Sequence, residues 1–304
     1  MIVVNRQKDK DLKMTGFIKE YLESHGKKCS ICVRENKTGK ETDFGEADCV
    51  LVLGGDGTLL QTAGNMIDTD IPLLGINLGT LGYLAEVEAA GVEEALHRLL
   101  LDEFEVEPRM MLKGKVHRGS NAIDHPQYEN ADSLEEADSF EEDDSFEEDD
   151  SFEEDYALND ITITRCGSLQ IIKFLLYVND MFLNSYDGDG VIVATPTGST
   201  GYNMSAGGPV VEPRAELILI TPVCPHTLNN ARSIILSAGD QIVIEVAPGR
   251  EGSIQQVEVN FDGGHRLNLC TGDRVEIERA DKTTNIIKLN KVSFLEILHK
   301  KMSD

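Results

Sequence analysis

The chain has 304 residues, 40% of them hydrophobic, and 54 acidic residues against 28 Lys and Arg give it a formal net charge of −26. That length accommodates two domains, each large enough to bury its own core. The negative charge argues against a broad surface for nucleic acid or for an anionic membrane, because both require clustered Lys and Arg. We therefore predict that neither nucleic acid nor a membrane is a partner.

The N-terminus is not typical of a targeting segment, because Arg6, Lys8 and Lys10 follow its short apolar run at once. No other apolar run approaches the length of a membrane span. The six cysteines include one CxxC pair, Cys29 and Cys32, which we interpret as free thiols rather than half of a zinc site or a redox pair. These features predict a cytoplasmic protein.

The first hundred residues alternate apolar, strand-like runs with helical patterns. The run 49–53 is continuously apolar and stops at two glycines, as a strand buried in a parallel sheet does. The alternation predicts an open α/β domain over residues 1–104. The expected elements are strands at 2–4, 49–53 and 71–76 and helices at 11–25, 58–66 and 92–101.

Beyond residue 104 the pattern changes to short strand-like runs separated by Gly, Pro, Asn and Asp, with little helix between them. This predicts a mainly β domain over 105–281, so the fold class is α/β followed by all-β. We expect the last segment, 282–304, to pack back on the first domain and to include a short helix at 292–298. The expected strands are 161–164, 171–178, 191–193, 217–220, 241–246 and 274–278.

An acidic tract interrupts the β domain. Residues 129–155 hold 16 acidic residues and no Lys or Arg, and they end in three identical tandem hexapeptides that begin at Asp138, Asp144 and Asp150. The mutual repulsion of these carboxylates and the small number of apolar residues disfavour a packed core. We predict a disordered insert over about 129–155.

The first candidate site is a Gly-rich turn between a buried strand and a helix, Gly54–Gly55–Asp56–Gly57–Thr58. Backbone N–H groups and a helix N-terminus meet at such a turn, which suits a phosphate. The turn lacks the lysine of a Walker A loop and the third glycine of a Rossmann fingerprint. Its acid, Asp56, fits a general base for an attacking hydroxyl or a Mg²⁺ ligand. A simple helix cap is the alternative interpretation.

The second candidate site runs from Asp187 to Pro209 and is dense in glycine and small hydroxyl residues. Such a segment is poor core material, because each glycine weakens a strand or a helix. Its hydroxyl groups can donate and accept hydrogen bonds to a sugar, and Tyr202 can stack on a base. The alternative interpretation, a set of tight turns, accounts for some of the glycines only.

Together these motifs resemble the NAD kinase family, in order and spacing from about residue 50 to residue 230. The resemblance implies a kinase that phosphorylates the 2′-hydroxyl of the adenosine ribose of NAD to give NADP. It also implies ATP or polyphosphate as donor, Mg²⁺ or another divalent cation, and a homo-oligomer, dimer or tetramer. The motifs are Gly54–Thr58, Leu74–Asn77 with Gly79–Tyr83, Asn159–Asp160, Gly188–Gly190, Thr195–Tyr202, Ser205–Pro209 and Pro225–His226.

Carried over residue by residue, the resemblance implies Asp56 as the general base and Gly54, Gly55 and Thr58 as contacts to the donor phosphates. The metal ligands are left unassigned. The NAD-binding residues that it implies are Gly57, Tyr83, Asn159, Asp160, Asp187, Asp189, Thr197, Thr200, Gly201, Tyr202 and Ser205.

The sequence departs from the family pattern at three places. Asp160 stands where the family has Glu, Gly201 stands where Ala is usual, and Asp262–Gly263–Gly264 replaces Asp-Gly-Gln, so we leave this last segment out of the site. Two other functions stay open. GGDGT also occurs in lipid kinases of the same superfamily, and the shortened carboxylate at 160 is compatible with a non-catalytic sensor of pyridine nucleotides.

Overall fold

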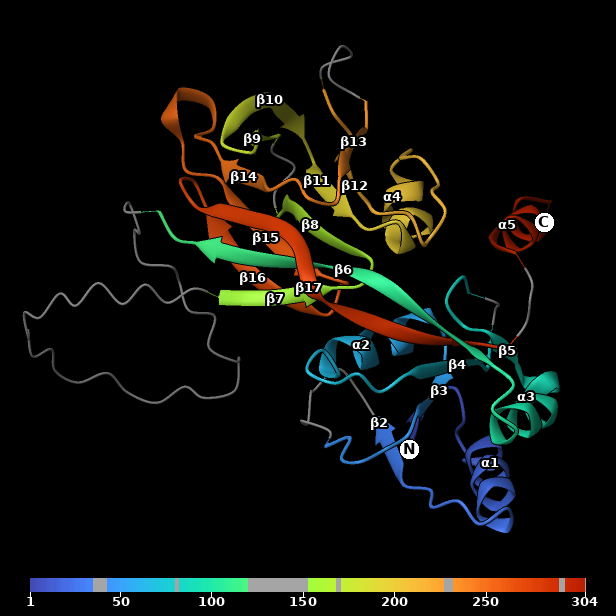
Figure 1. Ribbon diagram of the computed structural model, residues 1–304. Coiled ribbons are helices and arrows are strands. Elements are labelled where there is room, and N and C mark those ends of the chain that lie inside the picture. The colour runs from blue at the N-terminus through green and yellow to red at the C-terminus, as the bar shows by residue number, and fades with distance from the viewer. Residues whose placement is uncertain are drawn as a thin grey trace, which may run out of the picture.

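The computed structural model describes residues 1–34, 43–79, 82–119, 153–167, 171–226, 232–289 and 293–303. An α/β domain at the N-terminus is followed by a mainly β domain, so the predicted fold class is confirmed (Figure 1). Most of the predicted acidic insert lies outside the described residues. Its last three residues, Glu153, Glu154 and Asp155, are an exception, because they begin strand β7 (Glu153–Ala157). The predicted boundary at 155 was wrong: Glu154 pairs with Lys113 of the neighbouring strand at 3.0 Å.

The N-terminal domain is built on a parallel sheet with the order β4–β3–β1–β2. All residues of β3 and β4 are buried, because helices cover both faces of the sheet. Leu59 and Ala63 of α2 pack in one core cluster with Val50, whereas α1 and α3 pack on the other face. The elements are β1 (Ile2–Asn5), α1 (Lys13–Ser24), β2 (Ile31–Arg34), β3 (Val50–Gly54), α2 (Asp56–Asn65), β4 (Leu73–Asn77), β5 (Val87–Glu88) and α3 (Val92–Leu100).

The β domain packs two sheets face to face around one hydrophobic cluster that includes Phe174, Ile244, Ile163 and Val193. One sheet has the order β13–β12–β11–β8–β15–β16. Alternation of buried and half-exposed residues along β14 is the expected pattern for a strand with one buried face. The elements are β8 (Asp160–Arg165), β9 (Ile172–Val178), β10 (Met181–Gly188), β11 (Gly190–Ala194), β12 (Leu217–Val223), β13 (Ile234–Ser237), β14 (Ile242–Val246), β15 (Gln256–Phe261) and β16 (His265–Cys270).

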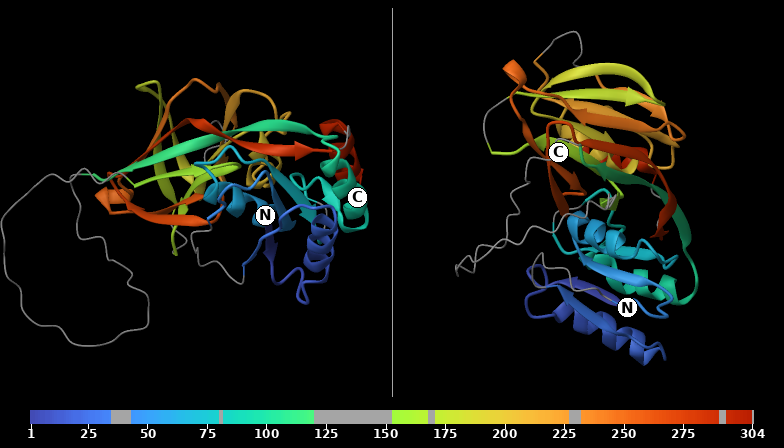
Figure 2. Two further views of the ribbon diagram at one scale, coloured as in Figure 1. Left: turned by 60° about the horizontal axis from the view of Figure 1, so that its bottom comes forward. Right: turned by 90° about the vertical axis from the view of Figure 1, so that its left-hand side faces the viewer.

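Two long strands, β6 (Glu105–His117) and β17 (Arg274–Lys288), connect the domains (Figures 1 and 2). They pair antiparallel, and Ile286 of β17 also pairs with Leu73 of β4, so one 11-stranded sheet passes through both domains. The sequence predicted a strand only at 274–278 and missed β6. An irregularity in register between Arg279 and Thr283 lets β17 bend and continue.

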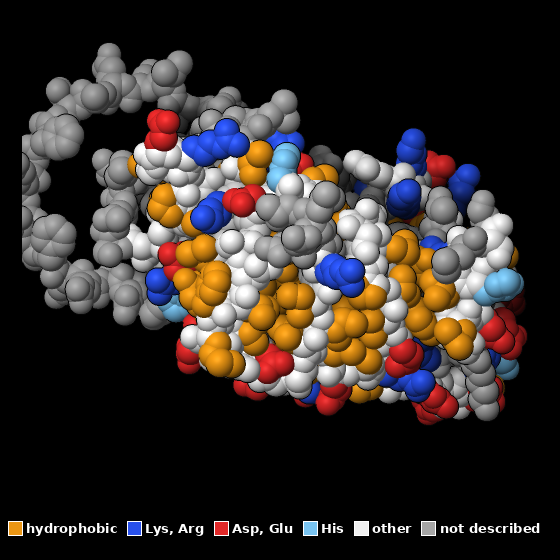
Figure 3. Space-filling model, turned by 90° about the horizontal axis from the view of Figure 1, so that it is seen from above, with side chains coloured by type: hydrophobic (Ala, Val, Ile, Leu, Met, Phe, Trp, Pro, Cys, Tyr) orange, Lys and Arg blue, Asp and Glu red, His pale blue; other side chains and the backbone are white. Residues whose placement is uncertain are grey.

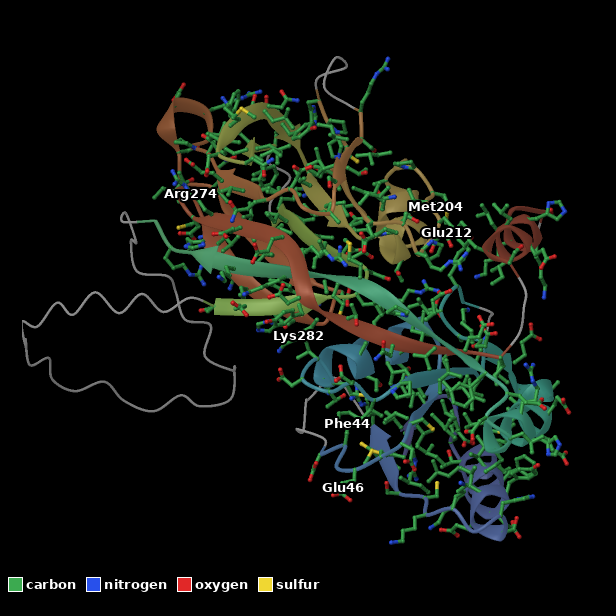
Figure 4. The ribbon with its side chains drawn as sticks, in the orientation of Figure 1. Phe44, Glu46, Met204, Glu212, Arg274 and Lys282 are labelled. Atoms are coloured by element: carbon green, nitrogen blue, oxygen red, sulfur yellow. The ribbon has the colours of Figure 1, made fainter. Side chains whose placement is uncertain are left out.

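The point where the domains meet is marked by Lys282, in the middle of β17 (Figure 4). Its ammonium group pairs with Asp68, which follows α2, and stands 5.2 Å from the ring centre of Tyr156 in β7. The two domains therefore share polar contacts as well as strands.

The C-terminal helix α5 (Phe294–Ser303) lies against the N-terminal domain. Lys300 is 3.6 Å from Glu88, and the ammonium of Lys301 stands 4.1 Å from the ring centre of Tyr83. The helix predicted at 292–298 is thus present, shifted toward the C-terminus. Of the helices in the described ranges, none is both long enough and apolar enough to cross a membrane. All six cysteines are free thiols.

Candidate active site

The Gly-rich turn joins β3 to α2 at the carboxyl edge of the parallel sheet. A Cβ on Gly54 would stand 2.4 Å from Oγ1 of Thr58, so this close approach requires glycine. Thr58 is buried, and its hydroxyl accepts a hydrogen bond from the amide of Asn5 at 3.4 Å. Gly57 lies exposed in the first turn of α2. The predicted donor-phosphate residues therefore lie together in one turn whose backbone is braced from β1.

Asp56 is the first residue of α2, but it does not cap that helix. Its carboxylate accepts hydrogen bonds from three consecutive backbone N–H groups in the loop after β4. Tyr83 donates to Oδ2 at 2.7 Å, and Leu84 and Ala85 both donate to Oδ1 at 3.3 Å. The helix-cap interpretation was wrong. The structure brings Tyr83, which the sequence assigned to NAD, beside Asp56 through its backbone.

The turn before β8 presents Asn159 and Asp160, and the carboxylate of Asp262 holds it in place. Asp262 accepts from the N–H groups of Leu158 and Asn159 at 2.7 Å each and from that of Asp160 at 3.1 Å. Asp262 itself has a left-handed backbone, with φ of 49°. The sequence analysis left this segment out of the site, and the structure brings Asp262 into contact with the turn of Asn159 and Asp160. The available signal was the Asp-Gly-Gly turn directly after the alternating strand β15.

The Thr- and Gly-rich cassette packs on the same turn. Thr195 donates through Oγ1 to the carbonyl of Leu158 at 2.6 Å and through its N–H to the carbonyl of Asn159 at 2.8 Å. A Cβ on Gly198 would stand 2.1 Å from that Asn159 carbonyl oxygen. Oδ1 of Asn159 is buried and has no hydrogen-bond partner among the described residues. A buried acceptor left in this state is typical of a ligand site.

A cavity of about 750 Å³ opens beside this turn. Four of the predicted NAD-binding residues line it: Asn159, Asp160, Asp189 and Tyr202. Leu60, one turn along α2 from Asp56, also lines it, so the N-terminal domain contributes to its wall. The sequence did not identify six other polar residues of the lining, Thr162, Thr164, Arg165, Cys224, Asn260 and Asp262.

The cavity contains carboxylates in two different electrostatic environments. Burial and the nearby charge of Asp262 raise the pKa of Asp160 to about 7. Burial likewise raises the pKa of Asp262, to about 6, although its three backbone hydrogen bonds act in the opposite direction. A third carboxylate of the lining, that of Asp189, forms an ion pair in which its Oδ1 lies 3.0 Å from Nε of Arg165. Asp160 and Asp262 are thus two neighbouring carboxyls of the lining whose pKa values are both raised toward neutral pH.

Other predicted residues lie outside the cavity lining. Thr197 is buried and accepts from the guanidinium of Arg109 at 3.2 Å, and Thr200 donates to the carbonyl of Thr197 at 3.3 Å. A Cβ on Gly201 would approach Nδ2 of Asn159 at 3.4 Å, so this glycine is a neighbour of the turn.

Two further residues predicted to bind NAD, Ser205 and Asp187, are also not part of the cavity lining. Ser205 is exposed at the end of the short helix α4 (Tyr202–Ser205). The carbonyl of Asp187 in β10 accepts from the N–H of His226 at 2.8 Å. No group of three or more His, Cys, Asp or Glu side chains suited to a metal ion occurs in the part of the chain that the structure describes.

The chain is similar to known proteins along almost its whole length. The chain matches two protein families, the ATP-NAD kinase N-terminal domain over residues 1–104 and the ATP-NAD kinase C-terminal domain over 158–289. It is 41% identical to the NAD kinase of Agathobacter rectalis, over 100% of this chain and 98% of that protein. It is 40% identical to the NAD kinase of Lachnospira eligens, over 99% of this chain and 98% of that protein.

Two solved structures share the fold. The crystal structure of yeast NADH kinase complexed with NADH has a TM-score of 0.77 at 22% identity, over 100% of this chain and 87% of that chain. An NAD kinase from Archaeoglobus fulgidus in complex with ATP has a TM-score of 0.72 at 23% identity, over 100% and 98%. With both domains matched along the chain and relatives of 40% identity over its full length, this protein belongs to the NAD kinase family.

Proposed function

We propose that this chain transfers the terminal phosphoryl group of ATP to the 2′-hydroxyl of the adenosine ribose of NAD, giving NADP. Polyphosphate is an alternative donor of the same chemistry. The observation that carries the proposal is the carboxylate of Asp56, held by three backbone N–H groups at the start of α2. An anion-binding turn with one fixed carboxylate suits a reaction that joins a phosphate to a hydroxyl.

In this mechanism Asp56 accepts the proton of the 2′-hydroxyl while the hydroxyl oxygen attacks the terminal phosphorus. The bond from that phosphorus to the bridging oxygen breaks, and ADP leaves. The three N–H groups from the loop after β4 hold the carboxylate in one orientation, which reduces the loss of freedom in the transition state. Gly54, Gly55 and Thr58 face the donor phosphates.

We assign NAD to the 750 Å³ cavity. The free acceptor of Asn159 and the carboxyl of Asp160 suit the hydroxyl groups of a ribose, and the ring of Tyr202 suits the adenine base. Asp189, at the bend between β10 and β11, also binds the substrate. Gly57, Tyr83, Asp187, Thr197, Thr200, Gly201 and Ser205 stay predictions of the sequence resemblance.

We also propose Mg²⁺ as the cofactor. Mg²⁺ keeps several waters and is commonly held by one or two carboxylates together with substrate phosphates, so it does not require a cage of protein ligands. With Asp56 assigned as the general base, the donor phosphates and water would supply the ligands of the ion. When bound, the ion would neutralise negative charge on the donor phosphates.

The test is an assay for NADP after incubation with NAD, ATP and Mg²⁺. The Asp56→Asn variant is expected to lose roughly 10²-fold or more in turnover with its fold retained. Asp70→Asn, an exposed acid of the same domain, is the matched control and is expected to behave as the wild type. An active Asp56→Asn variant contradicts the general-base assignment.

The NADP assay, a binding titration with NAD and a lipid phosphorylation assay together separate the two alternatives. A wild-type protein that binds NAD yet yields no NADP is a pyridine-nucleotide sensor. One that phosphorylates a lipid hydroxyl and not NAD is a lipid kinase of the GGDGT superfamily.

We further propose a cytoplasmic homo-oligomer, dimer or tetramer. Hydrophobic side chains gather on the face seen from above, where β9 and β10 lie in Figure 1 (Figure 3). In the hairpin of these strands Met181 is 70% exposed and Phe182 58%, and such apolar patches mark protein contacts. Light scattering is expected to show smaller particles for Phe182→Asp than for Leu101→Asp, an equally exposed control on the first domain.

A further inference from the structure

The loop after β1 brings the side chain of Lys8 to the loop after β4. Lys8 lies three residues beyond the end of β1, and its ammonium stands 3.4 Å from the position that a Cβ on Gly79 would occupy. Gly79 lies two residues beyond the end of β4, and β3 stands between β1 and β4 in the sheet. The loop and the side chain of Lys8 together therefore cross the carboxyl end of β3, where Gly54 and Gly55 begin the turn.

Hydrogen bonds tie this loop to the turn and to α1. The side-chain amide of Asn5 donates to Oγ1 of Thr58 at 3.4 Å, and the carbonyl of Asn5 accepts from the N–H of Lys8 at 2.9 Å. The buried carboxylate of Asp9 accepts from the N–H of Thr15 at 2.8 Å and from its hydroxyl at 2.7 Å. Hydrogen bonds of Asn5 before Lys8 and of Asp9 after it thus fix the backbone of the loop, while the side chain of Lys8 is exposed.

The Gly-rich turn supplies no cationic side chain of its own to a donor phosphate. The turn and the helix that follows it, residues 54–65, contain no Lys or Arg, and Asp56 adds a negative charge. The only groups that this segment offers to a donor triphosphate are therefore neutral N–H groups and the carboxylate of Asp56. P-loop enzymes solve the same problem with a lysine inside the loop, which contacts the terminal phosphates.

We propose that Lys8 binds the terminal phosphates of the nucleoside triphosphate donor, supplying from a neighbouring strand the cation that the turn lacks. The proposal rests on the donor site proposed above at Gly54, Gly55 and Thr58. Lys8 emerges at the sheet edge beside these residues and from the N-terminal domain, whereas the residues assigned to NAD lie mainly in the β domain. The donor, rather than the diphosphate of NAD, is therefore its ligand.

The experiment measures KM for ATP at saturating NAD and KM for NAD at saturating ATP, in Lys8→Ala, Lys8→Arg and Lys10→Ala. Loss of one charged hydrogen bond is expected to raise KM for ATP about tenfold or more in Lys8→Ala and to leave KM for NAD within about twofold. Lys8→Arg keeps the charge and is expected to recover most of the ATP affinity. Lys10→Ala, exposed in the same loop, is expected to match the wild type.

Three results overturn the inference. An unchanged KM for ATP in Lys8→Ala excludes a donor contact, a rise in KM for NAD alone assigns Lys8 to the acceptor, and an equal rise in both indicates a structural role. Thermal melting of each variant, together with direct titration of ATP by calorimetry, separates binding from folding. A wild-type protein that makes no NADP contradicts the proposed function itself. Unaltered ATP kinetics in Lys8→Ala beside an active wild type contradict only the role of Lys8.

Discussion

Gly82 lies against the carboxylate of Asp56: a Cβ at position 82 would stand only 1.8 Å from Oδ1 and 2.3 Å from Oδ2. The next three residues along the chain are those whose N–H groups bind that carboxylate. The loop after β4 thus reaches Asp56 closely because residue 82 has no side chain. The orientation of the proposed general base depends on a glycine outside the GGDGT motif.

We expect Gly82→Ala to lower turnover about 10²-fold, because a methyl group pushes the carboxylate of Asp56 out of its hydrogen bonds. Gly64→Ala in α2, the helix that begins with Asp56, is the control, since a Cβ on Gly64 meets nothing within 4 Å. Steady-state kinetics and melting temperature measure the two effects separately. Normal turnover in a folded Gly82→Ala protein contradicts the dependence of Asp56 on this contact.

Asp262 is expected to act on NAD through the turn that it holds. In Asp262→Asn one acceptor oxygen becomes a donor, so the three N–H groups of residues 158–160 lose part of their bonding. We expect KM for NAD to rise about tenfold or more and KM for ATP to stay near the wild-type value. The control is Asp240→Asn, because Asp240 accepts from the N–H of Ser237 in an exposed turn and is not part of the cavity lining.

Tyr202 and Asp189 are predicted to hold the acceptor. Both line the cavity, so alanine at either position is expected to weaken binding of NAD more than binding of ATP, as measured by calorimetry with each nucleotide. For Tyr202, Phe is the informative second variant, because it keeps the ring. Equal weakening of both nucleotides means that the two pockets have been assigned wrongly.

The affinity for NAD is expected to depend on pH through Asp160. With a pKa of about 7, its carboxyl is mostly neutral at pH 6 and mostly ionised at pH 8, and the ionised form accepts hydrogen bonds from ribose hydroxyls better. NAD should therefore bind more tightly as pH rises through about 7. In Asp160→Asn this dependence should be much weaker, with only the contribution of the neighbouring Asp262, whose pKa is about 6, remaining. Kd values for NAD measured from pH 6 to 8 test the assignment. If Asp160→Asn shows the same dependence of Kd on pH as the wild type, another group is responsible for the titration.

Stability should show the opposite trend from the same carboxyl. Its pKa is raised in the folded state above the ordinary value of 3.8, so the folded protein binds the proton more tightly than the unfolded chain. The contribution to the free energy of unfolding is complete below about pH 4 and is lost as pH rises through about 7. We expect Asp160→Asn to flatten that part of the profile, measured by urea denaturation at each pH.

The local elements of this protein could be predicted from its sequence. The apolar run before Gly54, the amphipathic helix near residue 95 and the cassette at Thr195–Tyr202 each carry their signal within a few neighbouring residues. Hydrophobic periodicity and glycine content reflect local backbone preference and the buried face of each element. They can therefore be recognised in the sequence before the fold is known. The fold class and the position of Asp56 at a strand–helix junction followed from these signals.

The partners of the site residues were decided by the tertiary structure alone. Asp56 meets N–H groups 27 to 29 residues away, and Asp262 meets N–H groups 102 to 104 residues away. The continuation of β17 into the first domain depends in the same way on β6 and β4 as neighbours. Such contacts form only once the packing of two cores has set which strands and loops lie side by side. Their energy comes from burying polar groups with a partner, and no local pattern in the sequence encodes that partner.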